Sequence, residues 1–195
     1  MTNPMPRLYP LFSKFGLLLL VGVLAGLLGC SSGPPQKAWH TERLTEEFTA
    51  DMLDTGVSDF ADYLALEERL FQQLHDKVYA KAETGPEHAL NRYSEGSAAD
   101  PNRASRNWNR SFELVADEPM GGVLLLHGMS DSPYSLRALG HRLHREGYHV
   151  IGLRLPGHGT APSGLRFATW QDMAAAAGLA IRHLVTSVGH RPLHI

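Results

Sequence analysis

The stretch GGVLLLHGMSDS at residues 121–132 decides the fold of this chain. Residues 123–126 carry no polar side chain, which is typical of a parallel strand that is buried on both faces of a sheet. His127 and Gly128 follow directly, and glycine permits a tight turn because it lacks a Cβ atom. The stretch therefore predicts a buried strand that ends in a sharp turn.

Further strand and helix patterns surround this stretch. Short strands are expected at residues 111–116 and 148–153, and another begins at Pro192. Helical patterns separate the later strands from one another. Alternating strands and helices at this spacing favour right-handed βαβ crossovers, so we predict an α/β fold with a parallel sheet and flanking helices.

One helix is expected between the strands at 121–126 and 148–153 and another before the strand that begins at Pro192, and both carry signals at their ends. Ser132 is expected to cap the first helix and Gly147 to end it. The second helix opens with a capping-box pattern at Thr169 and Asp172, and Gly189 is expected to close it.

A second loop motif, LPGHG at residues 155–159, follows the strand at 148–153. Pro156 fixes one φ angle, while Gly157 and Gly159 allow positive φ angles on either side of His158. The compact loop that results is expected at the carboxyl end of the sheet, where α/β proteins bind their ligands.

In their order and spacing, the two motifs resemble the N-terminal half of an α/β-hydrolase. The similarity covers residues 112–195 and is to monoacylglycerol lipase-like, lysophospholipase-like and serine aminopeptidase-like members. It implies that the backbone N–H of Met129 donates to the oxyanion of a tetrahedral intermediate, while His127 and Gly128 shape the loop. Because the catalytic histidine of this family follows the nucleophile, His127 is expected to brace the loop. Residues 156–159 would lie beside the active site.

The nucleophile of such an enzyme is not expected within this chain. One G-x-S-x-G match, at residues 29–33, follows an apolar N-terminal segment rather than a domain strand, and we assign it no catalytic role. Ser130 lies in the oxyanion loop and Ser132 at a helix cap. The serine, the Asp or Glu and the catalytic histidine are therefore expected beyond Ile195, and these 195 residues alone are expected to be inactive. Many relatives carry Asp where Arg154 stands.

The first 29 residues have the pattern of a signal peptide. Arg7 and Lys14 precede an uncharged stretch at 15–29, which is shorter than the roughly 20 residues of a membrane-spanning helix. The residues up to Cys30 resemble the lipobox of bacterial lipoproteins, which implies lipidation of Cys30. No Asp follows the cysteine, which implies an outer-membrane location facing the periplasm. An uncleaved anchor with an incidental cysteine is the alternative.

The remaining residues divide into three predicted parts. Residues 30–40 form a tether, residues 41–110 a helical extension and linker, and residues 111–195 the α/β domain, incomplete at its C-terminus. A helix-like pattern covers 41–53. In a second helix, four polar residues are interpreted as lying mostly off the apolar stripe: Glu67, Glu68, Gln72 and Gln73. That stripe consists of Phe60, Tyr63, Leu64, Leu70, Phe71, Leu74 and Val78.

Composition excludes several classes of protein. A formal net charge of −2 gives no reason to expect nucleic acid as a partner, and no phosphate-binding glycine motif is present. The single cysteine excludes an internal disulfide. His141 and His144 lie three residues apart but have no clear third ligand, so we expect no metal and no cofactor.

The sequence thus favours a serine hydrolase that acts on carboxylic esters, with a small-molecule or lipid ester as substrate and the membrane as a partner through Cys30. Two alternatives stay open. One is a truncated, non-catalytic envelope lipoprotein that binds a partner through its N-terminal helices. The other is a serine aminopeptidase-like hydrolase.

Overall fold

The structure, a computed structural model, describes residues 33–104 and 106–195. Its larger compact unit is Lys37–Ile195, and the fold below is that of this unit. The predicted signal peptide and the predicted lipidation site at Cys30 lie outside the described residues.

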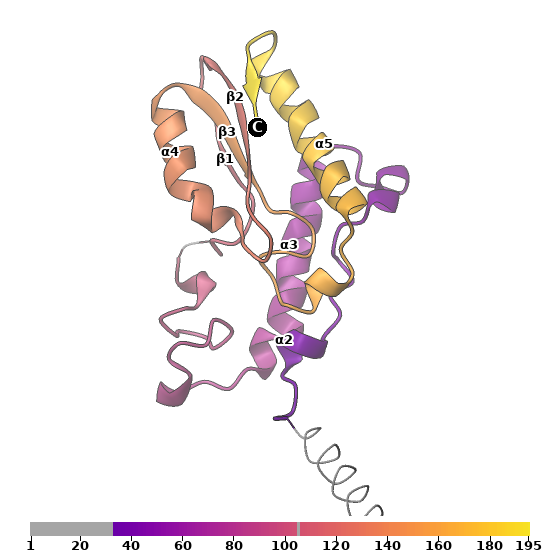
Figure 1. The fold of residues 1–195 in the computed structure, drawn as a ribbon, viewed down its shortest axis with the longest axis vertical. Helices are drawn as coiled ribbons and strands as arrows, with labels where there is room; N and C mark the ends of the chain where they lie inside the picture. The colour runs from indigo at the N-terminus through magenta and orange to yellow at the C-terminus, as the bar shows by residue number, and fades with distance from the viewer. Residues whose placement is uncertain (1–32, 105) are drawn as a thin grey trace, which may run out of the picture. The chain divides into compact units, whose positions relative to one another are not determined.

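A four-stranded sheet in the order β1-β3-β2-β4 forms the centre of this unit (Figure 1). β2 (Gly121–Leu126) pairs in parallel with β3 (Tyr148–Leu153) on one side and with β4 (Leu193–His194) on the other. β1 (Phe112–Leu114) pairs antiparallel with β3 at the edge. The four predicted strands and the α/β fold class are therefore confirmed.

The register of β2 and β3 sets the position of the two loop motifs. Val123 pairs with Val150, and at the carboxyl ends Leu126 pairs with Leu153. Both strands therefore end at the same edge of the sheet, and the loops that follow them are neighbours there.

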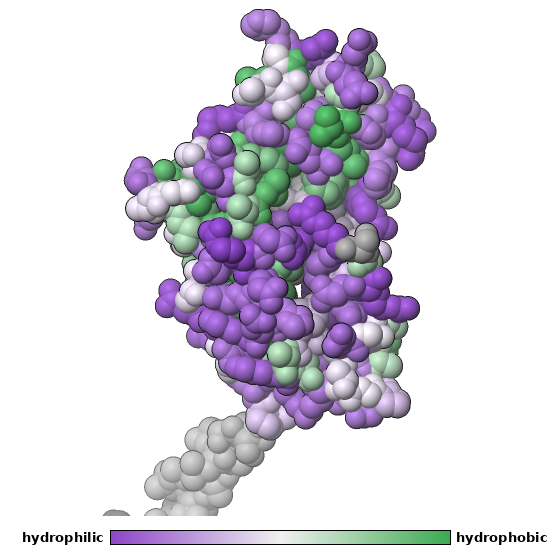
Figure 2. Space-filling model, turned by 180° about the vertical axis from the view of Figure 1, so that it is seen from behind, coloured by the Kyte–Doolittle hydropathy of each residue, from purple (hydrophilic) through white to green (hydrophobic). Residues whose placement is uncertain are grey.

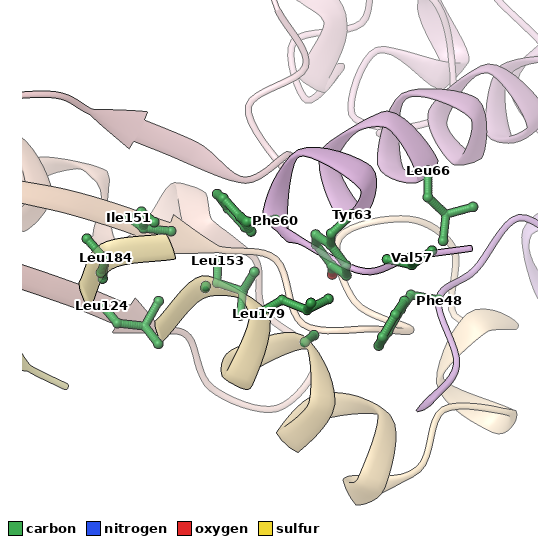
Figure 3. Close-up of a cluster of buried hydrophobic side chains, with 12 residues drawn as sticks. Phe48, Val57, Phe60, Tyr63, Leu66, Leu124, Ile151, Leu153, Leu179 and Leu184 are labelled. Atoms are coloured by element: carbon green, nitrogen blue, oxygen red, sulfur yellow. The ribbon is translucent and has the colours of Figure 1, made fainter. Parts of the chain in front are cut away.

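Helices cover both faces of the sheet (Figure 1). On one face, Val123 and Leu125 pack towards α4 (Arg137–Arg145). On the other, α5 (Trp170–Val188) lies against the sheet and α3 (Phe60–Lys77) lies against α5. Figure 3 shows the apolar core between these layers, which contains Phe48, Val57, Phe60, Tyr63, Leu66, Leu124, Ile151, Leu153, Leu179 and Leu184.

The short edge strand β1 depends on a glycine in its neighbour. Phe112 pairs with Gly152 of β3 and lays its ring over that residue. A Cβ atom at position 152 would lie 2.1 Å from a ring carbon of Phe112, which is far inside van der Waals contact. Glycine at this position lets β1 join the sheet.

Most of the predicted helix ends are confirmed. Thr169 and Asp172 form a reciprocal capping box at the start of α5. Gly189 after α5 has φ +63° and Gly147 after α4 has φ +92°, conformations that glycine adopts without strain.

The predicted capping of α4 by Ser132 is wrong. A 3-10 turn, η5 (Pro133–Leu136), comes between them, and Leu136 occupies the N-cap position of α4. The Ser132 hydroxyl instead donates to Oδ1 of Asn109 at 2.7 Å, so a contact distant in sequence takes the place of the cap. Further 3-10 turns are η2 (Tyr79–Lys81), η3 (Pro86–His88), η4 (Pro101–Arg103) and η6 (Gly164–Arg166).

The helix predicted at 41–53 is also wrong. Only α2 (Ala38–Thr41) and the 3-10 turn η1 (Ala50–Asp54) are helical there. Between them the chain places Phe48 in the core at 1% exposure, and the first amide of η1 donates to Oδ1 of Asp172 at 2.7 Å. These tertiary contacts outweigh the weak helical propensity of the segment.

The surface seen in Figure 2 is largely hydrophilic, with hydrophobic residues in separate patches. Among the described residues, none of the helices combines the length and the apolar character that crossing a membrane requires.

Candidate active site

The loops after β2 and β3 are joined by one buried side chain, His127. Its Nε2 atom accepts the N–H of Leu155 at 3.0 Å, and its Nδ1 atom lies 2.9 Å from the carbonyl oxygen of Gly128. Because the Leu155 amide can only donate, Nε2 must be the acceptor and Nδ1 must carry the proton. His127 therefore fixes the two loops relative to each other.

The electrostatic surroundings keep this ring neutral. Burial lowers the pKa of His127, and the neighbouring His158 lowers it further, whereas the hydrogen bond to Gly128 acts in the opposite direction. The net pKa is below the ordinary value of 6.5. A neutral ring is the form that the two hydrogen bonds require.

The β2 loop, residues 127–131, is exposed from Gly128 to Ser130. Met129 is 77% exposed, and Ser130 has φ +57°, a left-handed conformation that is uncommon for serine. Within the described part of the chain, the N–H groups of Met129 and Ser130 donate to no acceptor. A loop with free N–H donors can stabilise a developing oxyanion.

The β3 loop, residues 154–159, is compact and buried. Gly157 and Gly159 have φ angles of +80° and +72°. His158 is 1% exposed, its Nδ1 atom lies 2.9 Å from the carbonyl oxygen of Pro156, and its Nε2 atom is buried without a partner among the described residues. Its ring centre is 5.1 Å from that of His127.

Arg154 binds two carboxylates beneath this loop. Its side chain is 1% exposed, and its two terminal nitrogens donate to the two oxygens of Glu47 at 2.8 and 3.2 Å. Its Nε atom donates to Oε1 of Glu67 at 3.1 Å, and the Glu67 side chain is completely buried. We call these three residues the ion cluster.

The ion cluster also organises the backbone around it. Arg154 Nη1 donates to the carbonyl oxygens of Leu155 and His158, at 3.3 and 3.1 Å. The Ser111 hydroxyl accepts the Arg154 amide at 2.9 Å and donates to Glu67 at 2.8 Å. The Tyr63 hydroxyl donates to the Arg154 carbonyl oxygen at 2.6 Å. The β3 loop is therefore held from several sides.

Arg154 stays charged in this setting. Burial acts to lower the pKa of the guanidinium, but Glu47, Tyr63 and Glu67 raise it by more, so the pKa lies above its ordinary value. Burial also raises the pKa of Tyr63, which keeps that hydroxyl protonated as a donor.

The interpretation of Glu67 as lying off the apolar stripe is wrong. Glu67 is 1% exposed and stands four residues after Tyr63 and three before Leu70, so helical spacing itself places it on the buried face of α3. A carboxylate within an apolar stripe is the signal that could have revealed it. Glu47 and Ser111 gave no comparable signal, because their partner Arg154 is distant in sequence.

Neither serine near the β2 loop is paired with a base. Ser130 and Ser132 form no hydrogen bond to a histidine within residues 33–104 and 106–195, and Ser132 is bound to Asn109. A pocket beside the two loops is lined by Arg92, Tyr93, Ser130, Gly157, His158, Gly159, Thr160, Ala161, Pro162 and Leu165. The described residues thus provide loops and an adjoining pocket.

Comparisons with known proteins give limited matches. No protein family model matches the chain. A stretch of 55 residues is 40% identical to a thermostable monoacylglycerol lipase of Bacillus sp. (strain H-257). The matched stretch is 28% of this chain and 22% of that lipase. A solved structure from a study of metagenome-derived lipolytic enzymes aligns with 45% of this chain and 35% of its own, at 32% identity and a TM-score of 0.41. The sequence match supports a relation to α/β-hydrolases that cleave esters.

Loss of one carboxylate should destabilise the ion cluster. Removing one partner of a buried ion pair costs about 3–5 kcal/mol. Because Glu47 still pairs with Arg154, we expect Glu67→Gln to lower the free energy of unfolding by about 3 kcal/mol, the lower end of that range, as measured by urea denaturation.

Glu68 provides a matched control. It is the next residue on α3, it pairs with Arg110, and its side chain is 68% exposed. Glu68→Gln should therefore change the free energy of unfolding by less than about 1 kcal/mol. Equal effects of the two substitutions would contradict a structural role of the ion cluster.

The low pKa of His127 predicts a pH dependence of stability. Below its ordinary pKa of 6.5 the unfolded state binds a proton that the folded state does not. The stability that the neutral His127 contributes is therefore present above pH 6.5 and is lost as the pH falls towards the pKa of His127 in the folded state. We expect the free energy of unfolding of His127→Gln, measured by urea denaturation, to fall less steeply between about pH 7 and pH 5. The exposed His190→Gln should follow the unmodified chain, and parallel curves for all three would exclude this effect.

Proposed function

We propose that this chain is part of a serine hydrolase that acts on carboxylic esters. One observation carries the proposal: at the carboxyl end of two adjacent parallel strands, His127 fixes a loop in which the Met129 N–H has no acceptor among the described residues. Ester hydrolysis passes through an oxyanion, and such a donor is worth about 3–4 kcal/mol of barrier. The match to a monoacylglycerol lipase supports the same reaction class.

Each loop has a distinct part in this proposal. The Met129 N–H would be one oxyanion donor, with His127 and Gly128 shaping its loop. Residues 156–159 would line the site, and the adjoining pocket offers space for part of a small-molecule or lipid ester. The serine nucleophile, its acid and its histidine base would come from residues outside this chain, with serine attack, proton transfer to histidine and an acyl-enzyme intermediate.

The test removes the N–H while keeping the residue position. In the protein encoded by the full reading frame, Met129→Pro lacks the donor, whereas Met129→Ala keeps it. We expect Met129→Pro to lower kcat for short p-nitrophenyl esters by about 10²–10³-fold and Met129→Ala to change it only slightly. Thermal unfolding of both variants shows whether the loop change disturbs the fold.

Three outcomes would overturn the proposal or parts of it. Equal kcat values for the two variants would exclude Met129 as the donor. Absence of both ester turnover and fluorophosphonate labelling would favour a non-catalytic envelope lipoprotein. Turnover of aminoacyl anilides without ester turnover would favour a serine aminopeptidase.

We also propose attachment to the bacterial outer membrane through lipid on Cys30, on the side that faces the periplasm. The support is the lipobox-like sequence before that residue. Cys30→Ser should abolish both metabolic labelling with a fatty acid and the processed form on gels. Unchanged processing in this variant would exclude the lipoprotein assignment.

A further inference from the structure

Three residues of metal-binding types, one glutamate and two histidines, converge on the sheet face opposite α4. Glu113 lies on β1, His149 on β3 and His183 on α5. Oε1 of Glu113 is 2.7 Å from Nε2 of His149 and 2.7 Å from Nε2 of His183. Glu113 pairs with Ile151, and His149 precedes Ile151 by two residues, so their side chains share one face of the sheet.

In the structure, Oε1 of Glu113 is hydrogen-bonded to both imidazoles, and the three residues are close enough for a metal ion to take the place of these contacts. One ligand atom from each residue lies within 4.8 Å of the other two. Zinc binds imidazole nitrogen and carboxylate oxygen at about 2.0–2.2 Å, so ligand atoms around it are about 3.3–3.5 Å apart. Displacements of less than about 1 Å would bring all three residues to these distances.

The three side chains differ in burial: His149 is in the interior and His183 is nearest the surface. The His149 side chain is 5% exposed, that of Glu113 is 24% exposed and that of His183 is 37% exposed. A surface pocket borders His183 and is lined further by Ser58, Asp59, Phe60, Ala61, Leu179, Arg182 and Thr186. The cluster is therefore exposed to solvent on its His183 side.

We propose that Glu113, His149 and His183 form a binding site for a divalent transition metal of the zinc type. Two imidazoles and one carboxylate are a zinc-binding set, and three protein ligands leave a fourth position for water. Two nitrogen ligands favour zinc, cobalt or nickel over magnesium and calcium, which prefer oxygen. The ion would tie the short edge strand β1 to β3 and α5.

This site is separate from the candidate active site. His149 is the second residue of β3, whereas the β3 loop follows the end of that strand. Its ligands are also 36 and 34 residues apart in the sequence, which is why the spacing of histidines pointed only to His141 and His144. The inference does not rest on the proposed hydrolase activity.

The test is zinc binding to the full chain, carried out in a Cys30→Ser background so that the free thiol adds no ligand. Isothermal titration should give one Zn²⁺ per chain, and Mg²⁺ should give no signal. His183→Ala should weaken Zn²⁺ binding by more than the roughly 10- to 100-fold that loss of an outer-shell partner causes. Zn²⁺ should raise the melting temperature of the parent chain but not that of His183→Ala.

His141→Ala is the matched control. His141 is an exposed histidine on α4, outside the cluster, so its loss should leave Zn²⁺ affinity unchanged. Co²⁺ adds an independent readout, because four-coordinate cobalt absorbs visible light far more strongly than hydrated cobalt. That absorption should appear in the parent chain and disappear in Glu113→Gln. No stoichiometric Zn²⁺ binding, or equal losses in His183→Ala and His141→Ala, would overturn the proposal.

Discussion

The buried ion cluster is the interaction on which the rest of the structure depends. Arg154 follows β3, Glu67 lies on α3, and Glu47 lies in the segment between α2 and η1. These side chains are at most 12% exposed, so the guanidinium and the two carboxylates compensate each other, and Arg106 Nη2 lies a further 4.0 Å from Oε2 of Glu67. Because an uncompensated charge at this depth is strongly destabilising, the three parts of the chain hold one another in position.

This constraint connects the N-terminal part of the chain with the loops at the sheet edge. Glu67 accepts from both Ser111 and Arg154, and Ser111 in turn accepts the Arg154 amide. The guanidinium then donates to the carbonyl oxygens of Leu155 and His158. The conformation of the β3 loop therefore depends on α3, which packs along the same face of the sheet as α5 (Figure 1).

The sheet and most helix ends could be predicted because their determinants are local. The apolar run in β2, the capping box at Thr169 and the glycine after α5 each act within a few residues. The segment at 41–53 and the Ser132 cap could not be predicted, since contacts with residues far along the chain decide both.

The candidate site divides in the same way. The two loop motifs were visible in the sequence, and their proximity followed from the parallel strands. The hydrogen bond from Leu155 to His127 and the ion pair between Arg154 and Glu47 could not be predicted, because the sequence does not show which distant residue a polar side chain contacts. The burial of Glu67 could have been predicted, because its helical spacing from Tyr63 and Leu70 is a local signal, even though the sequence-based interpretation places it off the apolar stripe.

The conformation of the two loops requires the neutral form of His127. The Nδ1–H of the ring donates to the carbonyl oxygen of Gly128 and Nε2 accepts from the N–H of Leu155, so only the neutral form satisfies both groups. An imidazolium would turn the acceptor into a second donor that faces the Leu155 amide. Burial disfavours that charge and thereby holds the loop in one arrangement before any substrate binds. In the proposed hydrolase, this fixed loop would hold the Met129 N–H in place for an oxyanion.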